Sequence, residues 1–87
     1  MAKFKINNSF LLTERGEVLA GVIVEGIISP GDIAHLVINH NVIKSQIKSI
    51  EHIDHMQEKI SEIGLIIEPI GSDKYKDQLI GQIIITN

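Results

Sequence analysis

The chain has 87 residues, a formal net charge of −3 and no cysteine. This length accommodates one domain, over residues 1–87, and is too short for a GTPase, a kinase or a dinucleotide-binding enzyme. The lack of cysteine excludes a disulfide framework and a thiolate metal site, and it fits the cytoplasmic location that we expect.

The apolar segments are too short for a targeting or membrane function. Residues 1–8 have no long apolar core and no cleavage site, so we predict no signal peptide. The apolar run from Val22 to Ile28 is interrupted by Glu25 and Gly26 and falls well short of the roughly 20 residues of a membrane helix. The acidic balance, with eight basic residues spread along the chain, argues against nonspecific nucleic-acid binding.

Nineteen isoleucines favour β-structure, because β-branched side chains suit a pleated sheet better than a helix. Short apolar segments are separated by Gly, Pro, Asn and Asp throughout the chain. We predict strands over Lys3–Leu12, Glu17–Glu25, Ile33–His40, Val42–Ile53, Ile63–Glu68 and Ile80–Thr86.

The connections between these strands have recognisable turn residues. Asn7-Asn8 predicts a bulge or turn within the first strand, since Asn tolerates left-handed backbone. Ser29–Asp32, with Pro then Gly in the middle, predicts a type II turn. Gly21 inside the second strand indicates a bend or a close backbone approach. His40-Asn41 is the expected hairpin connection between the third and fourth strands.

Residues 54–61 are the one stretch with helical spacing. Ile53, Met56 and Ile60 are separated by three and then four residues, and Asp54 with Gln57 resembles a weak capping box. We therefore expect at most one short helical turn near residues 54–61, and a polar loop over Gly71–Gln78.

Together these elements predict an all-β fold, a small closed β-barrel of about six antiparallel strands. Closure hides strand edges, which matters for a chain with the apolar run Ile83–Ile85. The first strand follows Met1 at once and a closing strand is present, so we expect a complete barrel.

Residues Arg15–Asp32 follow the pattern R-G-x-V-x-x-G-x-I-x-x-G-x-I-x-x-G-D. This stretch resembles domain II of the translational GTPases, with the elongation factor Tu type nearest in pattern. The resemblance extends in order over almost the whole chain, through Ser9-Phe10, Ser49–Glu51, Ile63–Ile67 and Ile80–Ile84. It implies a domain II-like barrel without the GTPase domain, and the sequence has no phosphate-binding loop, so we expect no nucleotide.

In that family the barrel helps to hold the acceptor end of aminoacyl-tRNA or contacts ribosomal RNA. The resemblance implies that Glu51 occupies the position of a glutamate that packs against the terminal adenosine. Other positions differ: Asn7-Asn8 replaces an acidic pair, Glu62 an asparagine, and Val22 an arginine.

His52 and His55 are the first candidates for metal chemistry. On a helical turn, residues three apart lie on one side, where zinc or nickel accepts two imidazoles. Two ligands make no site without a third and fourth, so we expect surface histidines and no metal. The resemblance places Ala34 and Leu36 inside the barrel, which directs His35 outward. A metal-dependent enzyme that uses His52 and His55 is the third and least favoured hypothesis.

No arrangement of residues indicates catalysis. No serine lies in a strand–turn–helix elbow, and a barrel this small fills its interior with side chains rather than substrate. We therefore expect neither an enzyme nor a cofactor, and assign no catalytic residue.

Two binding surfaces remain. Lys44 and Lys48, together with Lys3 and Lys5, make a candidate positive face for RNA, to which the resemblance adds Glu51. The two loops that carry His52, His55 and Tyr75 are candidates for contact with a protein partner. The isoleucine excess either forms an interface, with a homodimer as one candidate, or replaces valine and leucine throughout the core.

We accordingly predict a non-catalytic binding module whose partner is another protein. An inhibitory accessory role of the immunity-protein type fits the size and charge. The alternative is an RNA- or ribosome-associated module of the translation-factor type.

Overall fold

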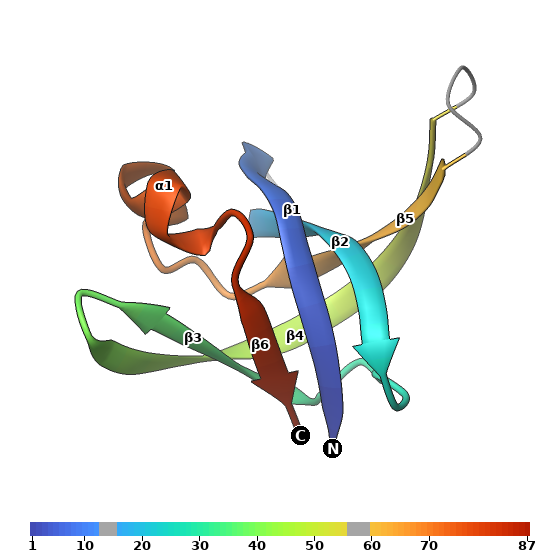
Figure 1. The fold of residues 1–87 in the computed structure, drawn as a ribbon, viewed down its shortest axis with the longest axis horizontal. Helices are drawn as coiled ribbons and strands as arrows, with labels where there is room; N and C mark the ends of the chain where they lie inside the picture. Colours follow the sequence, from blue (N-terminus) through green and yellow to red (C-terminus); the bar gives the residue numbers. More distant parts are fainter. Residues whose placement is uncertain (13–15, 56–59) are drawn as a thin grey trace.

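Six antiparallel strands form a closed barrel in the order β1-β2-β5-β4-β3-β6 in the computed structural model, which describes residues 1–12, 16–55 and 60–87 (Figure 1). The strands are β1 (Ala2–Leu12), β2 (Gly16–Glu25), β3 (Ile33–Ile38), β4 (Asn41–His55), β5 (Ile60–Ile67) and β6 (Ile83–Thr86). The all-β class and the closed six-stranded barrel are therefore confirmed.

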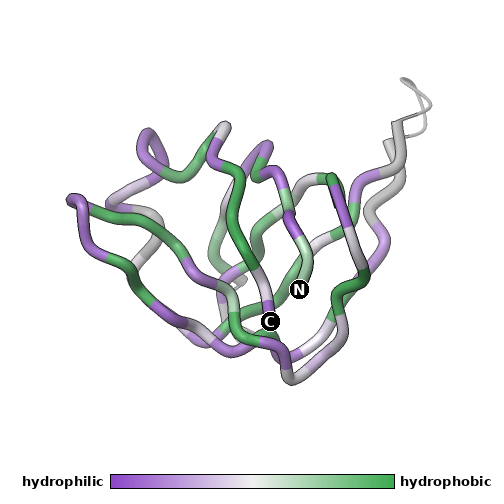
Figure 2. Tube along the Cα trace, turned by 60° about the horizontal axis from the view of Figure 1, so that its bottom comes forward, coloured by the Kyte–Doolittle hydropathy of each residue, from purple (hydrophilic) through white to green (hydrophobic). Residues whose placement is uncertain are grey.

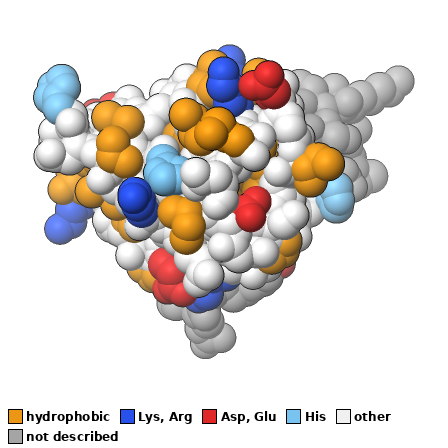
Figure 3. Space-filling view, turned by 90° about the horizontal axis from the view of Figure 1, so that it is seen from below, with side chains coloured by type: hydrophobic (Ala, Val, Ile, Leu, Met, Phe, Trp, Pro, Cys, Tyr) orange, Lys and Arg blue, Asp and Glu red, His pale blue; other side chains and the backbone are white. Residues whose placement is uncertain are grey.

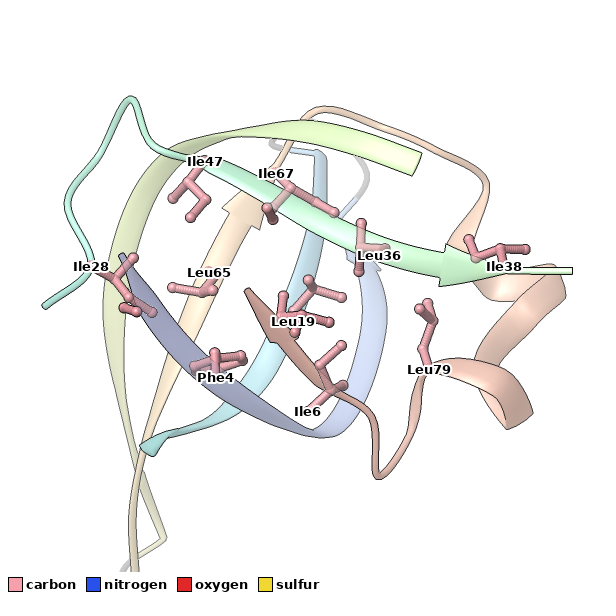
Figure 4. Packing of buried hydrophobic residues seen from close by; sticks show 13 residues of the cluster. Phe4, Ile6, Leu19, Ile28, Leu36, Ile38, Ile47, Leu65, Ile67 and Leu79 are labelled. Carbon is pink, nitrogen blue, oxygen red and sulfur yellow. The ribbon is translucent and has the colours of Figure 1, made fainter. Parts of the chain in front are cut away.

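The core follows from the two-residue repeat of the strands. In β1 the side chains of Ala2, Phe4 and Ile6 are buried while the lysines between them are exposed. The same alternation in β3 buries Ala34 and Leu36. Figure 2 shows the chain changing repeatedly between hydrophobic and hydrophilic residues, and Figure 4 shows the buried side chains filling the barrel interior.

Two irregularities that the sequence predicts are present. The register of β1 against β2 shifts between Ile6 and Asn8, which places the β-bulge at the Asn7-Asn8 pair. The Ser29–Asp32 segment is a turn: the Asp32 N–H donates to the Ser29 carbonyl at 3.1 Å, and Gly31 has a φ of 98°. The β3–β4 hairpin turns at Asn39-His40, with φ of 52° and 66°, one residue before the expected position.

The expected helical turn near residues 54–61 is wrong for the described part of that range. Asp54 and His55 belong to β4 and pair with Ser61 and Ile60 of β5, so the two strands continue outward as a ribbon (Figure 1). Residues 56–59 lie outside the described residues. The ladder satisfies backbone groups along both strands, whereas a single helical turn is marginal by itself.

Helical structure occurs instead in the predicted polar loop. A 3₁₀ turn, η1 (Ser72–Tyr75), leads directly into α1 (Lys76–Leu79). Leu79 is fully buried in the core cluster, and Tyr75 packs against it. Within the described ranges, no helix has the length and hydropathy needed to cross a membrane.

The barrel closes through its shortest strand. β6 begins at Ile83, three residues later than expected, because a turn with Gly81 at a φ of 89° precedes it. β6 pairs with β1 along four residues on one side. On the other side it pairs with β3 only at Ala34–Thr86 and His35–Ile85. We call this short contact between β3 and β6 the seam.

Candidate functional site

A groove of about 440 Å³ lies on the outer surface of the barrel along the seam. It is lined mainly by side chains of β3, β4, β6 and the turn before β6, namely His35, Val37, Val42, Gln82, Ile83 and Ile85. The four aliphatic side chains among them are between 41% and 60% exposed. Four large aliphatic side chains gathered in one hollow are more than the single exposed residues that surfaces ordinarily carry.

The groove exists because β3 and β6 separate beyond their second backbone pair. From that point the side-chain amide of Gln82 occupies the space between the strands. Its Oε1 accepts a hydrogen bond from the N–H of Val37 at 2.8 Å, and its Nε2 donates to the carbonyl oxygen of Val37 at 3.0 Å. At the floor of the groove, the backbone N–H and carbonyl of Val37 therefore have hydrogen-bond partners within the protein, and the walls are aliphatic.

Basic side chains border this groove. Strand pairing makes a continuous row from Lys3 through Ile85 and His35 to Lys44 across β1, β6, β3 and β4. In the neighbouring row, Lys5 pairs with Ile83 on one side of the groove. Figure 3, from below, shows hydrophobic side chains with lysine, histidine and acidic side chains among them. By register, lysines on β1 and on β4 therefore lie on the two sides of an apolar centre.

The predicted positive face is assembled only in part. Lys44 lies in the row that contains Lys3. Lys48, four residues along β4, instead places its ammonium beside Gly16 at the start of β2, 3.9 Å from where a Cβ on that glycine would lie. Lys44 therefore lies near the groove, whereas Lys48 lies near the start of β2. Glu51 is half-buried, on β4 opposite Gly64 of β5, outside the groove lining.

The loop residues predicted to contact a partner are not brought together. His52 is exposed on β4 and pairs with Ile63. His55 is the last residue of β4, so the described backbone carries both histidines on a strand rather than on a helical turn. The side chain of His55 lies outside the described ones. Tyr75 packs against the core on η1. Within the described ranges, no group of three His, Cys, Asp or Glu residues has the geometry of a metal site.

Two positions singled out by the resemblance do meet. The side-chain Nδ2 of Asn7 donates to Oε2 of Glu62 at 2.7 Å, which links the bulge of β1 to β5. The hydrogen bond spans the outer surface of the barrel.

The groove is not predicted from the sequence. Its aliphatic members come from three strands, and each looks like an ordinary strand residue. The one available signal was the two-residue alternation of β6, in which Ile83 and Ile85 occupy the positions that face away from the buried Ile84. Apolar residues on both faces of a strand indicate a second contact surface.

Comparison of the chain with models of protein families, with curated proteins and with solved structures finds no match. The resemblance to domain II of the translational GTPases therefore stays a prediction.

Proposed function

We propose that the chain is a non-catalytic module that binds another protein through the groove along the seam. The observation that carries this proposal is the cluster of exposed aliphatic side chains Val37, Val42, Ile83 and Ile85. Covering apolar surface of this kind is the main favourable term in most protein association. The barrel supplies a rigid frame, since all four residues lie on paired strands.

An inhibitory role is one form of this function. A small rigid barrel that covers a surface of its partner blocks whatever that surface does. If the captured partner is an enzyme, addition of the chain to that enzyme tests for inhibition directly.

The experiment compares three baits in lysate from the source cells, each with and without nuclease: the wild-type chain, Val42→Glu and Leu11→Glu. Val42 is 60% exposed in the groove, and Leu11 is 58% exposed near the end of β1 and outside the groove. A partner held by the wild type and by Leu11→Glu, lost by Val42→Glu and resistant to nuclease supports the proposal. Equal capture by all three baits refutes it.

RNA binding is the second candidate, and the lysines at the groove edges favour it. Lys3, Lys5 and Lys44 border the groove, and ammonium groups pair with phosphates as well as with carboxylates. With Lys44→Glu added as a fourth bait, this function predicts that the captured material contains RNA, is released by nuclease and is reduced for Lys44→Glu.

A further inference from the structure

The groove has the dimensions of a single extended peptide. Its row from Lys3 to Lys44 crosses four neighbouring strands, three steps of about 4.8 Å, which is about 14 Å between the outer strands. A single extended strand takes up about 4.8 Å in this direction. One strand lying over β6 and β3 thus contacts the aliphatic centre and brings its two edges close to the lysines.

The charge of this surface opposes that of the whole chain. The formal net charge is −3, yet from β1 to β4 the charged residues in these two rows are lysines, and Glu25 continues the first row only on β2. The ammonium group of Lys3 forms a long, solvent-exposed ion pair with the carboxylate of Glu25, at 3.6 Å. Lys5 and Lys44 are exposed and form no ion pair within the part of the chain that the structure describes. A ligand with carboxylates along its edges meets uncompensated ammonium groups there.

The floor and walls of the groove favour a peptide over RNA. Bases bind to proteins largely by stacking on exposed aromatic side chains. Phe4 is fully buried, and Phe10 and Tyr75 are only partly exposed and do not line the groove. Aliphatic walls accept Val, Leu or Ile side chains, which fill a hollow of this kind without polar partners.

We propose that the groove binds an extended acidic segment of a partner protein, in which aliphatic side chains enter the hollow and Asp or Glu side chains pair with Lys5 and Lys44. This inference rests on the proposed function and specifies the chemistry of its partner. Extended geometry places aliphatic residues at every second position of the bound stretch on the face that enters the hollow, since alternate side chains share a face.

The test begins with a phage-displayed library of random 12-residue peptides, panned on the immobilised wild-type chain and counter-selected on Val42→Glu. We expect the retained peptides to be enriched in Asp or Glu together with Val, Leu or Ile. The consensus peptide is then synthesised with a fluorescent label, and its affinity is measured by fluorescence anisotropy. A version with Asn and Gln in place of the acidic residues is the matched ligand.

The lysine variants provide the second arm. Lys5→Glu and Lys44→Glu should each weaken binding of the acidic peptide about two- to fivefold, and added salt should weaken it further. Lys48→Glu makes the same charge change on the same strand as Lys44→Glu but lies beside Gly16, so its effect should stay below about twofold. Circular dichroism establishes that every variant keeps the wild-type fold.

The possible outcomes distinguish failure of the acidic extended segment from failure of the proposed protein-binding function. Selection of neutral aliphatic peptides, with equal affinity for Lys44→Glu and wild type, overturns the acidic partner and leaves groove-dependent protein binding intact. Failure to select any peptide sensitive to Val42→Glu, while a lysate protein is still lost by that variant, overturns the extended segment alone. A labelled RNA that binds and responds to Lys44→Glu, with no acidic peptide selected, overturns the inference in favour of RNA.

Discussion

The side-chain amide of Gln82 pairs with the backbone of Val37 as a neighbouring peptide group would. Its oxygen accepts from the Val37 N–H at 2.8 Å and its nitrogen donates to the Val37 carbonyl at 3.0 Å. The same nitrogen donates to the Gln78 carbonyl at 3.1 Å, and the Gln78 side chain bonds in turn to Asn39. The side chains of Gln82 and Gln78 thus form hydrogen bonds to the end of β3 and the turn after it, where β6 has no backbone pair with β3.

Replacement of Gln82 with alanine should loosen this end of the seam. Both backbone groups of Val37 lose their partners, and because the bonds are near the surface, water replaces them in part, so we expect a loss of about 1–2 kcal/mol in the free energy of unfolding. Urea denaturation measures it. Hydrogen exchange should accelerate at the Val37 amide and stay unchanged at Asn39, whose amide bonds to Gln78. Gln46→Ala, an exposed glutamine on β4, should change stability by less than about 0.5 kcal/mol.

Glu17 should be the most important charged residue for stability. Its buried carboxylate accepts hydrogen bonds from the N–H groups of Ile70 at 3.0 Å and Gly71 at 2.7 Å, which fixes the chain between β5 and η1. Glu17→Ala leaves both donors without this acceptor and should cost about 2–4 kcal/mol, whereas Glu17→Gln retains an acceptor oxygen and should cost about 1 kcal/mol. Thermal unfolding of the two variants compares them.

The control for that prediction is Glu25→Ala. Glu25 forms an ion pair with Lys3 at 3.6 Å, and both side chains are about half exposed or more. Such pairs contribute little, so the change should stay within about 0.5 kcal/mol. A cost equal to that of Glu17→Ala would contradict the assignment.

Gly21 and Gly81 should respond to alanine for different reasons. A Cβ at Gly21 would overlap the carbonyl oxygen of Lys5 and approach the ring of Phe4 to 3.1 Å, so β1 and β2 would have to separate. We expect Gly21→Ala to cost more than about 3 kcal/mol or to prevent folding. A Cβ at Gly81 meets nothing within 4 Å, but its φ of 89° is strained for alanine, which should cost about 1–2 kcal/mol. Denaturant midpoints that reverse this order would contradict the close approach of β1 and β2.

Charged substitutions in the groove should separate binding from folding. Ile83 is 55% exposed, so Ile83→Glu should change the free energy of unfolding by less than about 1 kcal/mol. Its buried neighbour Ile84 gives the contrast, because Ile84→Glu places an unpaired charge in the core and should unfold the chain. Near-wild-type unfolding of Ile83→Glu combined with lost partner capture is the expected result. Unfolding of both variants would show that Ile83 is structural.

The sequence predicted the barrel well because its signals are local. The apolar segments between turn residues, the Asn bulge and the Ser29–Asp32 turn each depend on a few adjacent residues. The helical turn was misplaced for the opposite reason. Spacing favoured residues 54–61, but pairing of β4 with β5 extends to His55–Ile60 and overrides it. The helix that the structure contains, α1, buries Leu79 in the core, a tertiary contact that local spacing does not reveal.

The candidate site was less predictable, because the pairing register of four strands decides which side chains lie next to one another in it. Lys3 and Lys44 belong to one row only because β6 and β3 lie between their strands, which composition does not reveal. Lys44 and Lys48 look equivalent in the sequence. The register shift of β4 against β5 falls at Lys48, between Ile47 and Ser49, and accompanies the different surroundings of the two lysines. Gln82 was read as a strand residue, and its amide pairing with β3 depends on how the strands diverge.

The position of β6 between β1 and β3 has a kinetic consequence. The ring of strands closes only when the two ends of the chain meet, as in the pair Ala2–Thr86. Contacts so distant in sequence must overcome a large loop-closure entropy before they contribute. We therefore expect folding on the scale of milliseconds to seconds, with the β1–β2 and β3–β4 hairpins formed in the transition state. Docking of β6 then comes last, so substitutions in β6 should mainly accelerate unfolding.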